Sequence, residues 1–343
     1  MKKIFVVTVL FLIHCIAFAQ PFVPGASYFG RANYIEYIAG NLPLVITVPH
    51  GGSLTPGEIP DRSCGDESST DLYTVNLVKS IQQKITELTG CYPHIIINHL
   101  KRTKLDANRD LDIATCGNEF AEIAWNEFHL FIDSAKLSVE RKSSKGLLID
   151  LHGHGHANQR LELGYLLKGD QLSYPEAVLN TSASISLSSI RNLVGTNVNG
   201  FTHSELLHGI FSLGTMFASV GYPAVPGIDE PFPYPEEPYF RGGYNTERHG
   251  SLNEGTIDAI QIECNQDVRF EETARNSFGE TAAKIFLDYL IKHYFPDLPD
   301  IYCQPVDIQL SESGSFSLYP VPFMETLSVR SLIPVEVKVF SYR

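Results

Sequence analysis

The chain has 343 residues, of which 43% are hydrophobic and 19% are charged. This composition is typical of a globular protein and excludes an intrinsically disordered one. The formal net charge of −13 argues against nucleic-acid binding, because that function needs surfaces rich in lysine and arginine.

The N-terminus, residues 1–19, has the pattern of a secretory signal peptide. Lys2 and Lys3 precede an apolar run that ends in Ala-Phe-Ala before Gln20. A membrane anchor is one alternative, but the run is short for a transmembrane helix and no other long apolar stretch follows. A lipoprotein signal at Cys15 is the other, but His14 is bulky where a small residue is usual. We therefore expect cleavage before Gln20, no membrane span in the mature protein, and a location outside the cell or on its surface. Loss of the two lysines would change the net charge from −13 to −15.

Apolar runs and amphipathic stretches alternate along the rest of the chain. In chain order, the patterns predict a strand at 43–49, a helix at 70–89, a strand at 94–98, a helix at 117–141, strands at 146–151 and 256–264, and a helix at 270–295. This alternation favours an α/β domain over residues 20–299. We expect its central sheet to be mixed but mostly parallel, with helices on both faces.

Two further segments differ from this pattern. Residues 223–250 are dense in proline and glycine and too long for an ordinary connection, which indicates a functional loop or lid. Residues 300–343 alternate between polar and apolar side chains without a helical period. They predict a short C-terminal β segment.

The cysteines indicate structural disulfides rather than a metal site. Removal of the signal peptide leaves an odd number, namely Cys64, Cys91, Cys116, Cys264 and Cys303. No pair has CxxC spacing, so we do not expect a zinc site made of cysteines. One or two disulfides with a remaining thiol are the simplest expectation for an exported protein.

Polar residues follow the predicted strands at the points where the strands end. His50 follows the first strand, Asp150 and His152 end the third, and Glu263 ends the last. Reactive groups gather at the carboxyl ends of strands in open α/β sheets. Two histidines and a carboxylate, with a fourth position left open for water, form a catalytic zinc site. A further carboxylate that does not bind the metal could serve as general base.

Each of these residues also has an ordinary structural interpretation. A single histidine such as His50 is more often a satisfied core or surface residue than a ligand, and HGHGH could be a loose surface chelator. Asp66 and Glu67 both lie in the loop before the first helix, so either could supply the carboxylate ligand. A carboxylate in an apolar strand, such as Asp150, needs a partner, because a buried charge is costly.

The run LLIDLHGHGH, residues 147–156, places a carboxylate and three histidines at every second position. Asp150 lies two residues before His152 and therefore on the same face of the strand, where it can orient this histidine. His154 and His156 lie in the glycine-rich exit of the strand. We consider His154 a candidate for contact with substrate, and His156 a weaker one.

A basic cluster, HLKRTKLDANRD at residues 99–110, stands out in a chain with excess acid. Arginine matches a carboxylate with two parallel hydrogen bonds. Asn108 and Arg109 would suit a substrate carboxylate, and Arg102 could hold a second carboxylate or a developing oxyanion. The alternative is an exposed loop with ordinary salt bridges.

Taken in order, several motifs resemble those of the N-formylglutamate amidohydrolase family, whose fold is similar to that of the zinc carboxypeptidases. They are VPHGG, the segment around Asp66, RTKLDANR, LLIDLHGHGH, RGGYNTERHGS and IQIEC. The resemblance spans roughly residues 42–295 and implies a zinc ion held by His50, Asp66 and His152. It implies that Glu263 is the general base.

The same resemblance implies the substrate-binding residues. Asn108 and Arg109 would bind a substrate carboxylate with Arg102 nearby, and Tyr244 would lie in the loop that covers the substrate. The family's histidine-degradation enzymes are cytoplasmic and differ around the second metal ligand. The substrate therefore stays open.

Together these patterns predict a secreted zinc-dependent hydrolase that cleaves an amide bond in a carboxylate-bearing N-acyl amino acid or peptide. One alternative is a metallocarboxypeptidase or a cell-wall peptide amidase. Another is a non-catalytic binding protein on the same fold.

The C-terminus carries a second resemblance. SLYPVPFMETLSV, within residues 316–343, is similar to the start of the sorting domain used by the type IX secretion route of Bacteroidetes-type bacteria, although the segment is shorter than such domains usually are. This implies an interaction with secretion machinery. A structural β tail is the alternative.

Overall fold

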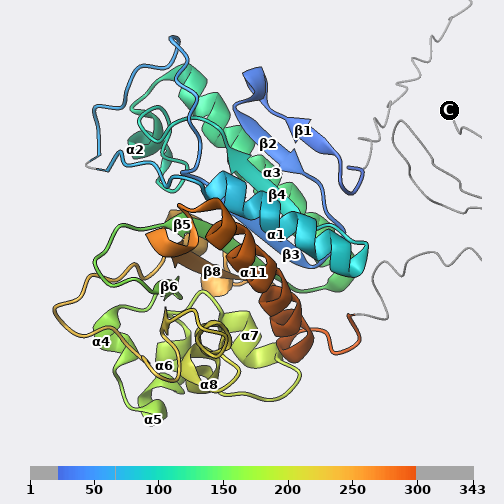
Figure 1. The fold of residues 1–343 in the computed structure, drawn as a ribbon, viewed down its shortest axis with the longest axis vertical. Helices are drawn as coiled ribbons and strands as arrows, with labels where there is room; N and C mark the ends of the chain where they lie inside the picture. Colours follow the sequence, from blue (N-terminus) through green and yellow to red (C-terminus); the bar gives the residue numbers. More distant parts are fainter. Residues whose placement is uncertain (1–21, 66, 299–343) are drawn as a thin grey trace, which may run out of the picture.

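The computed structural model describes residues 22–65 and 67–298. The expected signal peptide, the candidate ligand Asp66 and the C-terminal β segment lie outside these residues. Within them, a central sheet is covered by helices on both faces (Figure 1).

The sheet has eight strands in the order β1-β2-β4-β3-β5-β8-β6-β7. Their bounds are β1 Ser27–Phe29, β2 Ile35–Ile38, β3 Leu44–Val48, β4 His94–Asn98, β5 Gly146–Gly153, β6 Leu161–Gly164, β7 Ala224–Val225 and β8 Ile257–Cys264. The central strands β4, β3, β5 and β8 run parallel. Antiparallel pairs flank them, β2 beside β4 and β6 beside β8. The mixed, mostly parallel sheet predicted from the sequence is thus confirmed.

Three long helices cover the sheet, and shorter ones build the remaining surface. The helices are α1 Thr74–Thr89, α2 Leu111–Thr115, α3 Glu119–Ser143, α4 Gly169–Leu172, α5 Glu176–Leu179, α6 Ser182–Ile185, α7 Arg191–Thr196, α8 His203–His208, α9 Leu213–Ala218, α10 Tyr244–His249 and α11 Glu272–His293. In the described part of the chain, no helix combines the length and the apolar character that crossing a bilayer requires.

Alternate residues of the central strands point to opposite faces and build two hydrophobic cores. Ile46 and Ile149 point to the face covered by α1 and α11, which lie side by side in Figure 1. Val45 and Leu148 point to the other face, where they pack against α3. Each buried side chain of this size contributes about 1.5–3 kcal/mol, so both faces hold the sheet in place.

The sequence predicts the long elements but not the short ones. The four predicted strands and three predicted helices all form. The strands β1, β2, β6 and β7 and the short helices between residues 169 and 218 are too short to show a hydrophobic period. The predicted loop at 223–250 contains β7 and α10, and its middle has no regular structure.

A disulfide joins Cys64, in the loop before α1, to Cys116, directly after α2. This agrees with the expected structural disulfides. Cys264 at the end of β8 is a buried thiol.

Candidate metal centre and active site

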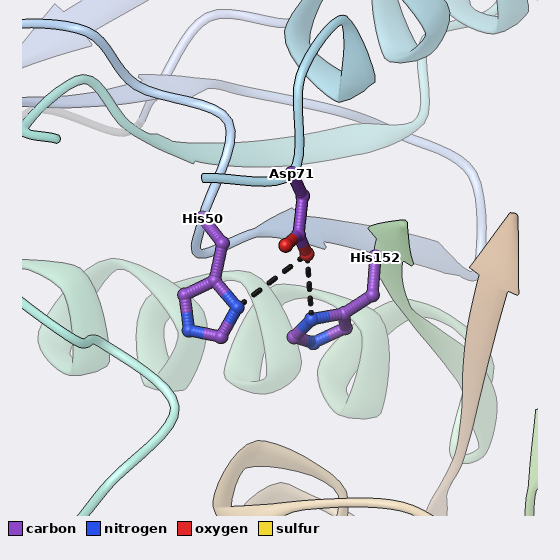
Figure 2. Close-up of side chains that lie close together, drawn as sticks. All are labelled: His50, Asp71 and His152. Carbon is purple, nitrogen blue, oxygen red and sulfur yellow. Dashed lines mark hydrogen bonds and ion pairs between the residues drawn. The ribbon is translucent and has the colours of Figure 1, made fainter. Parts of the chain in front are cut away.

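Three buried side chains converge at the carboxyl edge of the sheet (Figure 2). His50 follows β3, His152 lies near the end of β5, and Asp71 comes from the loop before α1. Asp71 Oδ2 lies 3.2 Å from Nδ1 of His152 and 3.5 Å from Nδ1 of His50. One carboxylate oxygen therefore faces both histidines.

This donor set fits a zinc ion. Ligand atoms bonded to tetrahedral zinc at about 2.0–2.2 Å lie about 3.4 Å apart, close to the two distances from Asp71 Oδ2. Nδ1 of His50 is buried and has no hydrogen-bond partner in the described part of the chain. Leaving a buried polar nitrogen unsatisfied is costly, and a metal ion would satisfy it.

A second buried carboxylate holds each histidine from behind. Nε2 of His50 lies 2.6 Å from Asp106 Oδ1, and Nε2 of His152 lies 2.8 Å from Asp150 Oδ2. An ionised carboxylate can only accept a hydrogen bond, so Nε2 of each ring carries the proton. Both rings therefore turn the lone pair of Nδ1 toward Asp71, as metal ligation requires.

The aspartate on β5 is itself held in place. Asp150 Oδ1 accepts hydrogen bonds from Thr47 of β3, at 2.5 Å, and from Asn245 of α10, at 3.2 Å. Asp150 is fully buried, so these donors compensate for lost hydration. The strand spacing that placed Asp150 beside His152 in the sequence is observed in the structure.

The centre favours ionised carboxylates and a positively charged partner. Burial opposes ionisation of Asp71, but the neighbouring imidazoles of His152 and His50 lower the pKa of Asp71 well below its usual range. Burial likewise opposes protonation of His152, but the carboxylates of Asp150 and Asp71 raise its pKa well above the ordinary value. A metal cation could take the place of the proton that this arrangement favours.

Glu263 lies beside the three metal-facing residues without joining them. It is paired with His152 in the sheet, and Glu263 Oε1 is 3.9 Å from Nδ1 of His152. Burial raises the pKa of Glu263 to about 8, and the charges of Asp71 and Glu162 act in the same direction, whereas His152 opposes them. A carboxylate with a raised pKa next to a metal site is a candidate general base.

Asp71 was missed by the sequence analysis, which named Asp66 or Glu67. Asp66 lies outside the described residues, and the side chain of Glu67 accepts hydrogen bonds from the backbone of Ser68 and Ser69. The helix predicted at 70–89 includes Asp71, yet α1 begins only at Thr74 because Tyr73 adopts a left-handed conformation, with φ of 69°.

The loop before α1 places Asp71 by contacts with distant segments. Its backbone N–H donates to the carbonyl of His50 at 3.0 Å, and its Oδ2 accepts from the backbone N–H of Gly153 at 3.1 Å. The available signal in the sequence was the aspartate just before the apolar spacing of the helix becomes regular.

An arginine cluster surrounds Asp106. Arg102 Nε donates to Asp106 Oδ2 at 2.9 Å, and Arg62 lies 3.6 Å from the same oxygen. Burial opposes ionisation of Asp106, but His50, Arg102 and Arg109 lower its pKa well below the usual range. Among the described residues, Arg109 has no carboxylate partner and is only partly buried; its guanidinium donates to the carbonyl of Asn108. Three arginines around one aspartate leave positive charge available for an anion.

The structure places Asn108, another predicted substrate-binding residue, at the edge of the centre, whereas Tyr244 lies against α3. Asn108 Oδ1 accepts from the backbone N–H of Asn245 at 2.7 Å, and its Nδ2 is 3.3 Å from Nε2 of His152. A Cβ on Gly243 would collide with Asn108, so only glycine allows this close approach. Tyr244 packs against the rings of Trp125 and His129. Asn108 thus connects the start of α10 to the metal centre.

The two later histidines of the HGHGH motif differ from each other. Nε2 of His154 lies 2.8 Å from the carbonyl of Arg160, and its Nδ1 accepts from the backbone N–H of His156. Both nitrogens of His154 therefore bond to backbone. Nδ1 of His156 lies 2.7 Å from Glu162 Oε1, and its Nε2 bonds to no atom in the described ranges.

Arg269 joins three segments that contribute to the centre. Its guanidinium donates to the carbonyls of Leu72, His154 and Cys264. These positions adjoin Asp71, the exit from β5, and Glu263. Its hydrogen bonds therefore go to backbone carbonyls of three segments rather than to the carboxylate of Glu263.

Comparisons with known proteins return structural neighbours only. No protein-family model matches the chain, and no curated protein does. Similar solved structures include N-formylglutamate amidohydrolase from Ralstonia eutropha JMP134, at 13% identity over 74% of this chain and 96% of that chain, with a TM-score of 0.44. A gene product of Agrobacterium tumefaciens shows 11% identity over 75% and 93%, with a TM-score of 0.45. An N-acetylmuramyl-L-alanine amidase from Mycobacterium abscessus shows 13% identity over 74% and 100%, with a TM-score of 0.29.

Proposed function

We propose that this chain is a zinc-dependent hydrolase of amide bonds, acting on a carboxylate-bearing N-acyl amino acid or peptide. One observation carries the proposal. Two buried histidines turn Nδ1 toward one oxygen of Asp71, each histidine is held at Nε2 by a buried aspartate, and the carboxylate of Glu263 lies alongside. Purely structural histidines do not need this shared orientation.

His50, Asp71 and His152 would hold the metal. A zinc ion bound there would polarise the scissile carbonyl and lower the pKa of water toward about 7. Glu263 accepts a proton from the attacking water and returns it to the departing nitrogen, so that the C–N bond breaks and a carboxylic acid and an amine form. The raised pKa of Glu263 makes it a stronger base when it is ionised.

The arginine cluster supports a substrate with a carboxylate. Arg109 is partly exposed and has no acidic partner in the described part of the chain, so its guanidinium is available for a bidentate contact. Arg102 is committed to Asp106 through Nε. We assign the substrate carboxylate to Arg109 and give Arg102 the role of supporting it and the nearby oxyanion.

The deciding experiment compares metal content and hydrolysis in wild-type protein and a Glu263→Gln variant. Substrates are N-formyl and N-acetyl amino acids and short peptides. We expect wild-type protein to retain zinc after dialysis and to hydrolyse at least one of these substrates. Glu263→Gln keeps its shape but cannot take up the proton, so it should keep zinc and lose about 10²–10⁴-fold in rate.

The matched control is Glu36→Gln, which alters a largely buried, hydrogen-bonded acid on β2. It should keep near wild-type rate. A stable, zinc-loaded Glu263→Gln with unchanged rate would refute the base assignment. Zinc retention without hydrolysis of any substrate would favour the non-catalytic binding protein.

We also propose export of the protein. The Cys64–Cys116 disulfide suits an oxidising compartment, since cytosolic thiols are kept reduced. Detection of the chain in the medium or at the cell surface, starting at Gln20, would support this location. The interaction of the C-terminal segment with secretion machinery stays a prediction from the sequence.

A further inference from the structure

Another carboxylate lies beside Glu263, in the row of paired residues that crosses the sheet from His152. In the sheet, Glu263 of β8 is paired with His152 of β5 on one side and with Glu162 of β6 on the other. Directly paired residues point to the same face of a sheet. Glu162 therefore lies next to Glu263, on the side away from the metal centre.

Glu162 is fully buried, and each of its oxygens holds a different group. Oε1 lies 2.7 Å from Nδ1 of His156, and Oε2 accepts the backbone N–H of Phe240 at 2.8 Å. One carboxylate thus fixes both an imidazole from the exit of β5 and a position in the proline-rich segment before α10. A buried carboxylate with two such bonds is a rigid support.

The two residues held by Glu162 stack their rings on each other. The ring of His156 stacks on that of Phe240, with centroids 4.7 Å apart and planes 13° from parallel. Phe240 is 43% exposed, and the side chain of His156 is 19% exposed. Apolar ring surface is thus open to solvent one strand away from Glu263.

The hydrogen-bonding character of His156 follows from its partner. A carboxylate can only accept, so Nδ1 carries the proton that bonds to Glu162. In the neutral ring, Nε2 is then an acceptor, and within residues 22–65 and 67–298 the side-chain hydrogen bond of His156 runs through Nδ1 alone. His154 differs, because both of its nitrogens already bond to backbone.

We propose that His156 and Phe240 form a substrate subsite that binds a second peptide unit, whose N–H donates to Nε2 of His156 while its plane packs against the Phe240 ring. A peptide unit is planar and carries an N–H, so it matches both the exposed Phe240 ring and the acceptor beside it. This inference rests on the proposed function only for the position of the scissile bond; binding at the subsite can be measured without turnover. It favours peptides over single N-acyl amino acids.

The test measures the affinity of zinc-loaded Glu263→Gln protein for three unhydrolysed ligands by calorimetry. They are an N-acetyl amino acid, the corresponding N-acetyl dipeptide, and the same dipeptide N-methylated at its peptide nitrogen. One hydrogen bond should make the dipeptide bind about fivefold to tenfold more tightly than the amino acid. N-methylation removes the donor and should abolish this gain.

Variants in the Glu263→Gln background assign the gain to the subsite. His156→Ala should abolish it, and Phe240→Ala should reduce it. Glu162→Gln can still bond both groups but leaves Nε2 of His156 as a donor, so the gain should also fall. The matched control is His99→Ala, which removes another His–Glu pair, with Nε2 of His99 2.9 Å from Glu36, and should keep the gain.

The outcomes separate this inference from the proposed hydrolysis. A gain that survives His156→Ala or N-methylation, or no gain in the parent, would refute the subsite even if wild-type protein hydrolyses N-acyl amino acids. If the gain depends on His156 but wild-type protein hydrolyses none of the substrates, the subsite is supported and the hydrolase is refuted. A sugar-linked ligand that shows the gain where the dipeptide shows none would overturn the peptide assignment.

Discussion

The candidate metal centre has a strand-borne half and a loop-borne half, and the two are held in different ways. His152, Asp150 and Glu263 lie on β5 and β8, where sheet register fixes their spacing. Asp71 and Asp106 lie in loops. Strand geometry sets the first half locally, whereas the second half depends on contacts between segments far apart in the chain.

The loop-borne half is braced by Arg62 and a disulfide. The guanidinium of Arg62 donates to the carbonyls of Arg102, Ile113 and Glu67 and lies 3.6 Å from Asp106. Cys64, two residues later, is covalently joined to Cys116. These contacts fix a loop that has no regular secondary structure. They offer a way to disturb one half of the centre without the other.

The largest expected effect concerns Asp71, the candidate ligand in the loop-borne half. Asp71→Ala should abolish tight zinc binding, as His50→Ala and His152→Ala should, because three protein ligands are the minimum for such a site. Asp66→Ala should retain zinc. Metal analysis after dialysis checks all four variants. Zinc loss in Asp66→Ala together with retention in Asp71→Ala would return the ligand role to Asp66.

This comparison also explains what the sequence could predict. Asp150, His152 and Glu263 follow apolar strands with a two-residue period, so their shared edge and face are readable from the pattern. Asp71 is placed by the backbone of His50 and Gly153, which a local pattern does not encode. Arg269 illustrates the same limit, since it donates hydrogen bonds to backbone carbonyls of three segments that lie far apart in the sequence.

A second expected effect tests the brace directly. Replacing both Cys64 and Cys116 by serine removes a crosslink between residues 52 positions apart, which chain-entropy arguments value at about 4 kcal/mol of unfolding free energy. Denaturant unfolding measures this loss. Hydrogen exchange should rise first around residues 57–73 and later in β5. Equal increases in both regions would show that the brace does not act on the loop selectively.

The third effect concerns Asp258, a buried acid at the start of β8, the end away from Glu263. Asp258 accepts hydrogen bonds from Ser251, Asn192, the backbone of Leu193, and Tyr294. Burial nevertheless raises the pKa of Asp258 to about 6, against these donors, from an unfolded value near 3.8. The folded state therefore binds the proton more tightly than the unfolded state does.

Protonation of Asp258 therefore stabilises the folded state at low pH. The stabilisation from protonated Asp258 is complete below about pH 4 and is lost as the pH rises through about 6, on the order of 3 kcal/mol in total. Asp258→Asn cannot titrate, so its deficit in unfolding free energy relative to wild type should grow as the pH falls from 7 to 4. Chemical unfolding at several pH values measures it. A constant deficit would mean that Asp258 keeps an ordinary pKa.

The smallest effect comes from changing one matched residue in each half of the centre. Asp106→Asn and Asp150→Asn each remove the carboxylate behind a metal-facing histidine, and such changes typically cost about 10–100-fold in metal affinity. Chelator competition measures that affinity. Asp150 has two further donors, from Thr47 and Asn245, that an asparagine oxygen can still accept. Asp106 also pairs with Arg102 and Arg62, which an amide cannot neutralise. We therefore expect the greater loss in the loop-borne variant, and a greater loss in Asp150→Asn would show that strand register alone does not hold His152.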